Sequence, residues 1–149
     1  MTHLNAGDKA PVFTATDHNG NAIDSKLFPG KKVILYFYPK DDTPGCTAEA
    51  CNLRDNYQEL INKGFILLGV SPDKIESHQK FAAKYQLPFP LIPDPEKLII
   101  KSFGVWGPKK FMGRTYDGVH RTTFIIDENG LIEKVITQVD TKNHASQII

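Results

Sequence analysis

The chain has 149 residues, of which 40% are hydrophobic and 23% charged, and its formal net charge is +1. This size and composition fit a single soluble globular domain spanning residues 1–149. The near-neutral charge and scattered lysines predict no nucleic-acid partner, and the apolar runs are too short to cross a bilayer. Because the N-terminus has no signal-peptide pattern, we expect a cytoplasmic protein.

The first elements are a hairpin, a strand and a helix. Two short extended segments, Phe13–Thr16 and Ala22–Asp24, flank an Asn-Gly turn and predict a β-hairpin. The continuous apolar run Lys32–Tyr38 predicts a strand that is buried on both faces. Apolar residues at helical spacing then predict a helix from near Cys46 to Asn62.

A second strand and helix follow. The run Phe65–Val70 predicts another buried strand, and a helix is expected after it, ending at about Tyr85. Ser71 is the candidate N-cap of that helix and Pro72 its first residue. Because Leu87–Pro95 contains four prolines, this segment is expected to be largely extended.

The last third of the chain predicts a short helix around Glu96–Phe103 and a β-hairpin formed by Thr122–Ile126 and Leu131–Val139 across an Asn-Gly turn. His144–Ile149 is expected to begin a final helix. The whole order of elements fits an α/β thioredoxin-like fold with an added N-terminal β-hairpin.

The chain contains two cysteines, Cys46 and Cys51. In a reducing compartment a redox role is expected before a structural disulfide, and two cysteines are too few for a structural zinc site. Cys46 follows Pro44-Gly45 where a strand gives way to a helix, and the unpaired N–H groups of a helix start stabilise a thiolate. A lone cysteine is more often a small buried apolar residue, but this context favours a reactive thiolate.

The spacing of the two cysteines constrains any bond between them. Five residues along a helix place the Cα atoms roughly 8–9 Å apart and on different faces, whereas a disulfide needs about 7 Å or less. If Cys46 and Cys51 bond, the first turns of the helix must therefore unwind. A reductase of the C-x-x-C type would not require this, and Cys51 as a helix core residue that never reacts remains an alternative.

The segment Pro39–Cys46 has the pattern Pro-x3-Thr-x2-Cys, which resembles the peroxiredoxin active-site motif. The continuation to Cys51 and the segment Gly104–Asp127 resemble the peroxiredoxin Q subfamily, also called bacterioferritin comigratory proteins. The resemblance covers nearly the entire chain. It implies a thiol-dependent peroxidase that reduces hydrogen peroxide and organic hydroperoxides in antioxidant defence, with neither a cofactor nor a metal.

The resemblance also implies roles for six residues: Cys46 as the peroxidatic cysteine, Cys51 as the resolving cysteine of an intramolecular disulfide, Thr43 as the hydroxyl partner, Arg121 as the charged partner, Pro39 as the shield of the thiolate, and Glu49 as the carboxylate that orients the arginine. It implies thioredoxin or a similar dithiol as the reductant, and a monomer. Similar proteins continue the last helix beyond the position of Ile149, which suggests a truncated C-terminus.

The residue types suit that chemistry. Arg121 carries a fixed charge and a fork of donors that can stabilise the thiolate and bind a peroxide, and Thr43 offers a rotatable hydroxyl. Taken alone, Arg121 would be a solvated strand residue and Thr43 a loop residue. Glu49 could equally be a first-turn carboxylate favoured by the helix dipole.

Other polar and aromatic residues carry less information. Trp106, Phe111 and Met112 either line a peroxide entrance or, more commonly, serve as packing. The four histidines outside the N-terminus show no ligand spacing and are expected at the surface: His18, His78, His120 and His144. The pair Asp41-Asp42 is expected in a solvated loop rather than a metal site.

Two other functions remain open for this sequence. A thiol–disulfide exchange protein or redox sensor would react slowly with peroxide but exchange readily with protein disulfides. A non-catalytic thioredoxin-like binding module would have an ordinary, unactivated thiol.

Overall fold

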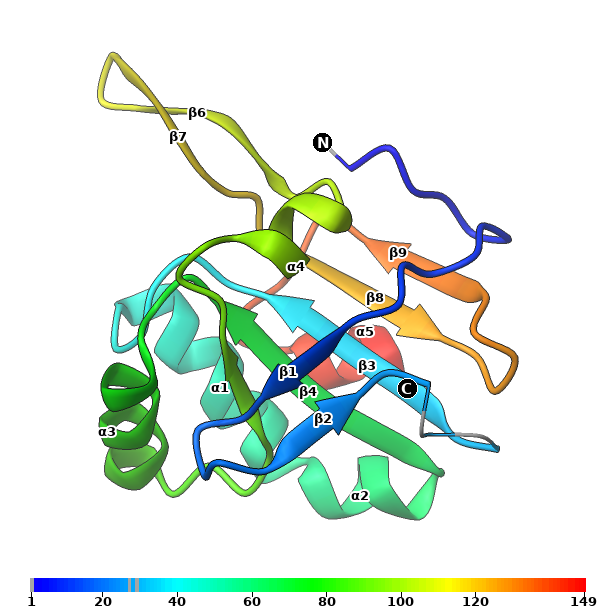
Figure 1. The fold of residues 1–149 in the computed structure, drawn as a ribbon. Coiled ribbons are helices and arrows are strands. Elements are labelled where there is room, and N and C mark those ends of the chain that lie inside the picture. The colour runs from blue at the N-terminus through cyan, green and yellow to red at the C-terminus, as the bar shows by residue number, and fades with distance from the viewer. Residues whose placement is uncertain (1, 27, 29) are drawn as a thin grey trace.

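The computed structural model describes residues 2–26, 28 and 30–149, and a five-stranded sheet in the order β5-β4-β3-β8-β9 forms its centre (Figure 1). Three of these strands are parallel to one another: β3 (Lys32–Phe37), β4 (Phe65–Ser71) and β5 (Leu91–Pro93). The other two, β8 (Thr122–Ile126) and β9 (Ile132–Ile136), form a hairpin, and β8 joins it to the sheet by pairing antiparallel with β3.

Both faces of the sheet are covered, as the apolar strand runs predict. The side chains of β3 alternate between two apolar clusters, so that Ile34 and Tyr36 enter one core and Leu35 and Phe37 the other. Four helices contribute to the first core: α1 (Pro44–Asp55), α2 (Tyr57–Asn62), α3 (Ile75–Tyr85) and α5 (His144–Ile148). The second core includes residues of α4 (Leu98–Ser102) and of the N-terminal hairpin of β1 (Thr14–Thr16) and β2 (Ala22–Asp24).

This arrangement confirms the thioredoxin-like fold with an added N-terminal hairpin. In Figure 1 the hairpin β1–β2 lies across one face of the sheet, and α1 and α5 lie behind it. Among the described residues, no helix is long and apolar enough to span a membrane.

The helix expected from Cys46 to Asn62 is instead two helices. Its first part begins at Pro44, and Asn56 interrupts it with a non-helical backbone at φ −108° and ψ 10°. The Asn56 side chain donates a hydrogen bond to the carbonyl of Asn52, which also accepts the Asn56 N–H, so both donors of Asn56 turn back to the end of α1.

The predicted N-cap of α3 is wrong. Ser71 is the last residue of β4, is fully buried and pairs with Pro93, while α3 begins at Ile75 with Lys74 in the N-cap position. The Ser71 hydroxyl instead donates a hydrogen bond to Asp73. The strand extends further than its apolar run because its edge continues to pair with β5.

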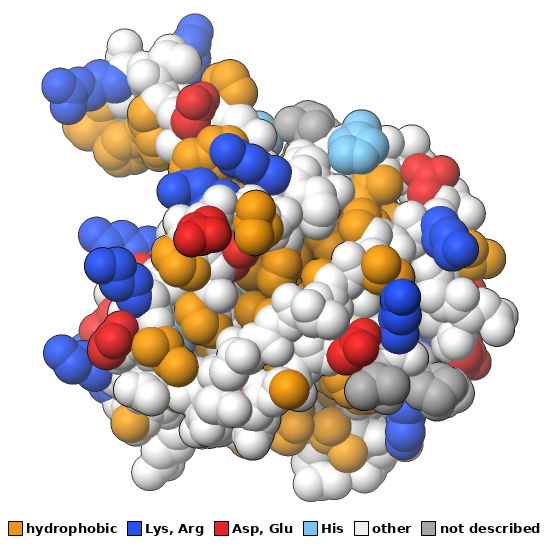
Figure 2. Space-filling view, in the orientation of Figure 1, with side chains coloured by type: hydrophobic (Ala, Val, Ile, Leu, Met, Phe, Trp, Pro, Cys, Tyr) orange, Lys and Arg blue, Asp and Glu red, His pale blue; other side chains and the backbone are white. Residues whose placement is uncertain are grey.

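A hairpin of β6 (Trp106–Phe111) and β7 (Arg114–Val119) was not expected, and it projects from the body of the protein (Figures 1 and 2). Its two turn residues, Met112 and Gly113, have positive φ, and methionine at the first of these positions hides the usual hairpin signal. Phe111 and Met112 are highly exposed at the tip, so neither packs in the core, whereas Trp106 packs against the second core.

Candidate active site

Cys46 occupies the first turn of α1 and is 1% exposed. Thr43 is the extended N-cap residue and Pro44 is the first helical residue, where its missing N–H costs nothing. The free N–H groups of this first turn and the positive helix end both favour an anion at the cysteine sulfur. The local sequence thus places the sulfur where a thiolate is stabilised.

Arg121 connects Cys46 to Glu49. Its Nη2 donates to the Cys46 Sγ at 3.3 Å, and its Nη1 donates to the Glu49 Oε1 at 2.7 Å. Gly45 permits this approach, because a Cβ at that position would lie 3.2 Å from the Arg121 Nη2. Although burial alone would lower it, the pKa of Arg121 is raised by the neighbouring Glu49 and Cys46, so the guanidinium stays charged beside the sulfur.

Glu49 lies one turn after Cys46 on α1 and is fully buried. Burial raises the pKa of Glu49 to about 7, against the opposing effect of the Arg121 charge. Its second oxygen, Oε2, has no hydrogen-bond partner among the described residues, and it faces the His144 Nε2 at 3.5 Å. The arginine is therefore held by a carboxyl group whose charge depends on pH near neutrality.

Three of the histidines expected at the surface are buried, so that prediction is wrong for His18, His78 and His144. Each has hydrogen-bond partners that replace water: the Leu91 N–H donates to the His18 Nδ1, and His144 and His78 contact polar side chains. His120 is partly exposed.

Thr43 and Pro39 lie in the loop between β3 and α1, and Pro39 is half-buried. The Thr43 hydroxyl donates to the Lys40 carbonyl at 2.9 Å. That bond uses the hydroxyl hydrogen and leaves the oxygen lone pairs available as acceptors. Among the hydrogen bonds of the described residues, none joins this hydroxyl to Cys46.

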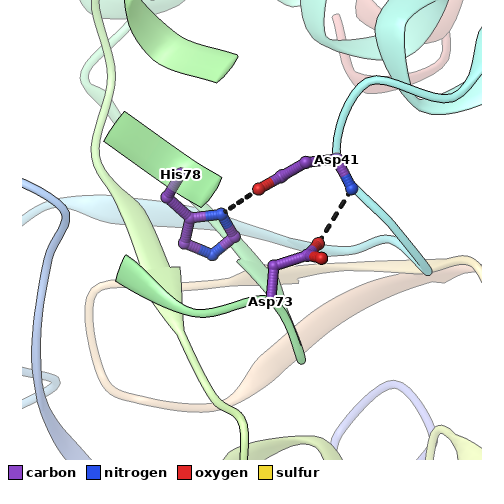
Figure 3. A group of neighbouring side chains, drawn as sticks. All are labelled: Asp41, Asp73 and His78. Carbon is purple, nitrogen blue, oxygen red and sulfur yellow. Dashed lines mark hydrogen bonds and ion pairs between the residues drawn. The ribbon is translucent and has the colours of Figure 1, made fainter. Parts of the chain in front are cut away.

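The same loop is anchored by Asp41, Asp73 and His78, which form the cluster in Figure 3. The His78 Nδ1 lies 2.7 Å from the Asp41 Oδ2, and the Asp41 N–H donates to the Asp73 Oδ2 at 2.8 Å. Tyr38 also donates to Asp41, at 2.6 Å. Asp41 is 8% exposed, so the prediction of a solvated Asp41-Asp42 loop is wrong for Asp41 and right for Asp42, which is exposed. The cluster fixes the loop before the cysteine against α3.

Cys51 is half-buried on α1, and both thiols are free. Directly after it, the Asn52 side chain joins α1 to α5: its Nδ2 donates to the Lys142 carbonyl at 3.0 Å, and its Oδ1 accepts the Ala145 N–H at 2.8 Å. Because α1 is continuous past both cysteines, they are separated by helical geometry in this reduced form.

Sequence reasoning anticipated the group of Cys46, Glu49 and Arg121, and the structure brings these three together. It missed His144, Asp41 and Asn52, whose roles depend on contacts between distant segments. The local sequence gives no signal for His144, because Ser146 and Gln147 in the same C-terminal segment are polar as well.

The chain is similar to known proteins over nearly its whole length. Residues 6–135 match the AhpC/TSA family. The chain is 47% identical to peroxiredoxin Bcp of Escherichia coli over 149 residues, covering 100% of this chain and 96% of that protein. It is 46% identical to a putative peroxiredoxin bcp of Haemophilus influenzae, with the same coverage of this chain.

Solved structures agree with these relatives. A cysteine-to-serine mutant of Xylella fastidiosa PrxQ superposes with a TM-score of 0.92 at 28% identity, covering 99% of this chain and 94% of that one. The bacterioferritin comigratory protein of Xanthomonas campestris, described for its alkyl peroxide reduction activity, has a TM-score of 0.88 at 29% identity and covers 97% of this chain and 94% of that one.

Proposed function

The chain belongs to the AhpC/TSA family and is a peroxiredoxin of the Bcp or PrxQ type, a thiol-dependent peroxidase, and from this premise we propose that Cys46 is its peroxidatic residue and Cys51 its resolving residue. The observation that carries the proposal is the 3.3 Å contact from the Arg121 guanidinium to the Cys46 sulfur at a helix N-terminus.

In the first step, the Cys46 thiolate attacks one oxygen of the hydroperoxide and the O–O bond breaks. The sulfur becomes a sulfenic acid, and the other oxygen leaves as hydroxide or alkoxide and takes up a proton. Arg121 and the first N–H groups of α1 are donors aimed at the region where this negative charge develops. The Thr43 hydroxyl oxygen is the proposed hydrogen-bond acceptor for the peroxide O–H, and Pro39 shields the sulfur from water.

In the second step, the Cys51 thiol attacks the sulfenic sulfur, a disulfide forms and water leaves. Helical geometry forbids this bond in the reduced form, so the first turns of α1 unwind and Glu49 leaves Arg121. The Asn52 side chain, held by α5, marks the end of the segment that must unwind. The enzyme therefore alternates between a folded reduced state and a locally unfolded oxidised state.

In the third step, an external dithiol reduces the disulfide and restores both thiols, for which we propose thioredoxin or a similar protein. We propose that the protein acts in the cytoplasm on hydrogen peroxide and organic hydroperoxides, and that it acts as a monomer, since the steps above require no residue of a second copy. Light scattering of the reduced protein tests the oligomeric state, and a stable dimer would contradict it.

The assay is consumption of hydrogen peroxide coupled to thioredoxin, its reductase and NADPH. Cys46→Ser is expected to abolish turnover, because a hydroxyl at this position is not ionised as a thiolate is. Cys51→Ser is expected to retain the first turnover and lose the following ones, because sulfenic acid forms but no intramolecular partner resolves it. Full activity in Cys46→Ser would overturn the proposal, and sustained thioredoxin-dependent turnover in Cys51→Ser would overturn the resolving role.

A further inference from the structure

His144 is the first residue of α5, almost 100 positions after Cys46 in the chain, yet it is fully buried against the active-site carboxyl group. Its Nε2 lies 3.5 Å from the Glu49 Oε2 and 2.7 Å from the Thr123 Oγ1. Its Nδ1 lies 2.8 Å from the Gln147 Oε1. The ring is therefore held on both sides with one nitrogen directed at Glu49.

The surroundings fix which ring nitrogen carries the hydrogen. The Gln147 Oε1 accepts the Asp140 N–H at 2.9 Å, and the Gln147 Nε2 donates to the Gln138 carbonyl at 2.8 Å. These backbone partners set the orientation of the amide, so the atom facing the His144 Nδ1 is an acceptor and Nδ1 must be the donor. In the neutral ring, Nε2 then presents its lone pair to Thr123 and Glu49.

That lone pair faces the one oxygen of Glu49 that has no hydrogen-bond partner among the described residues. The Thr123 hydroxyl at 2.7 Å can donate to the Nε2 lone pair, but it gives the Glu49 Oε2 no partner. A carboxylate oxygen facing a nitrogen lone pair in a dry core is unfavourable, whereas a proton held by these two groups removes the carboxylate charge and gives the Glu49 oxygen a partner. We propose that His144 is a positioning residue which, by sharing a single proton with Glu49, keeps the carboxyl group neutral and leaves the charge of Arg121 directed at the Cys46 sulfur.

The proton on Glu49 and His144 affects Cys46 because the Arg121 guanidinium contacts both Glu49 and Cys46. When the pair of Glu49 and His144 holds its proton, the guanidinium neutralises one anion, the Cys46 thiolate. When the pair loses that proton, the guanidinium is shared between two anions, and the carboxylate also opposes the thiolate. The proton on this pair therefore increases the thiolate population of Cys46. Only the effect of this proton on catalysis rests on the proposed function.

The other charged groups around the pair are compatible with this role. Burial lowers the pKa of His144, with Gln147 and Asp140 acting in the opposite direction and Arg121 adding to the lowering, so the proton is held mainly on Glu49. The Tyr36 phenol also faces this region, and burial raises its pKa well above its usual range, so it stays neutral. Lys109 interacts with Arg121 and Cys46, and burial lowers its pKa.

The test is the rate of alkylation of Cys46 by iodoacetamide, which requires a thiolate but no peroxidase activity. It is measured in the Cys51→Ser background, where Cys46 is the single thiol, with and without His144→Gln. Glutamine offers an N–H to the Glu49 Oε2 but has no basic nitrogen to accept a proton, so the variant favours the carboxylate form of Glu49 over the protonated form that His144 favours.

We expect Cys51→Ser to be alkylated roughly three- to tenfold faster than Cys51→Ser with His144→Gln near neutral pH. The ratio of the two rates is expected to approach one below about pH 5 and above about pH 8.5. A purely structural role would keep the ratio at its neutral value down to the lowest pH, which would overturn the inference. The maximum of this ratio near neutral pH is also expected to vanish in a Glu49→Gln background, where no proton is shared. A maximum that persists there would overturn the inference as well.

His18→Gln serves as the matched control, because His18 is another buried histidine, whose ring accepts the Leu91 N–H. Its alkylation profile is expected to follow that of the parent protein. Nitrogen NMR of the imidazoles provides the same test without altering His144: a pH-dependent step in the Nε2 signal that Glu49→Gln abolishes supports a shared proton, and a step unaffected by Glu49→Gln overturns it. Absence of peroxide consumption would overturn the proposed function alone.

Discussion

Replacing Glu49 by glutamine is predicted to change how the stability of the protein depends on pH. Glutamine has nearly the same shape as a protonated glutamic acid: its oxygen can accept from the Arg121 Nη1, and its N–H can donate to the His144 Nε2. The substitution therefore keeps the contacts of the neutral side chain and removes its titration.

The magnitude follows from the pKa of Glu49, which burial raises from 4.5 to about 7. Below about pH 4.5 both the folded and the unfolded protein hold this proton, so it has no differential effect on stability. As the pH rises toward 7, the unfolded chain releases the proton while the folded protein retains it, and the wild-type fold loses about 3 kcal/mol of stability. Above about pH 7 the loss is complete.

The assay is urea unfolding of the reduced wild-type and Glu49→Gln proteins at several pH values between about 4 and 8. The free energy of unfolding of the variant minus that of the wild type is expected to increase by about 3 kcal/mol across this range. A difference that stays constant would show that Glu49 does not titrate there. A difference that decreases with pH would show that the Arg121 charge outweighs burial, and either result would refute the reasoning.

Three further predictions concern the site and the core. Arg121→Lys is expected to slow the reaction of Cys46 with hydrogen peroxide by roughly 100-fold in stopped-flow experiments, since an ammonium group cannot reproduce the fork that contacts both Cys46 and Glu49, and a change below threefold would contradict this. Gly69→Ala is expected to lower the free energy of unfolding by about 1–3 kcal/mol, because its Cβ would lie 2.9 Å from the buried Tyr36 ring, and an unchanged urea midpoint would be inconsistent with that clash. Oxidation by one equivalent of peroxide is expected to remove hydrogen-exchange protection from the first two turns of α1, and a disulfide that forms with these amides still protected would disprove the unwinding step.

Features of the fold that depend on local pattern could be predicted from the sequence. The buried runs of β3 and β4 were recognisable because strands covered on both faces are continuously apolar. The hairpins around Asn-Gly turns were recognisable for a similar reason, whereas the β6–β7 hairpin was not, because Met112 supplies an unusual positive φ. The start of α3 was misplaced because the pairing of Ser71 with Pro93 cannot be read from either segment alone.

In the candidate site, too, some residues could be predicted from local sequence and others depend on tertiary packing. Cys46, Thr43 and Glu49 lie within seven residues of one another, and their motif together with Arg121 was sufficient to predict them as candidates. His144 could not be predicted as part of the site, because its contact with Glu49 depends on how α5 packs against α1. The burial of Asp41 likewise depends on His78, which lies on a separate helix.

The central claim is that the Cys46 thiolate itself attacks the peroxide. The most direct measurement is peptide mapping by mass spectrometry of the Cys51→Ser protein after one equivalent of hydrogen peroxide in the presence of dimedone, which traps sulfenic acids. We predict a single dimedone adduct on the peptide that contains Cys46, formed in proportion to the peroxide consumed. Consumption of the peroxide with the Cys46 thiol left unmodified would contradict the account.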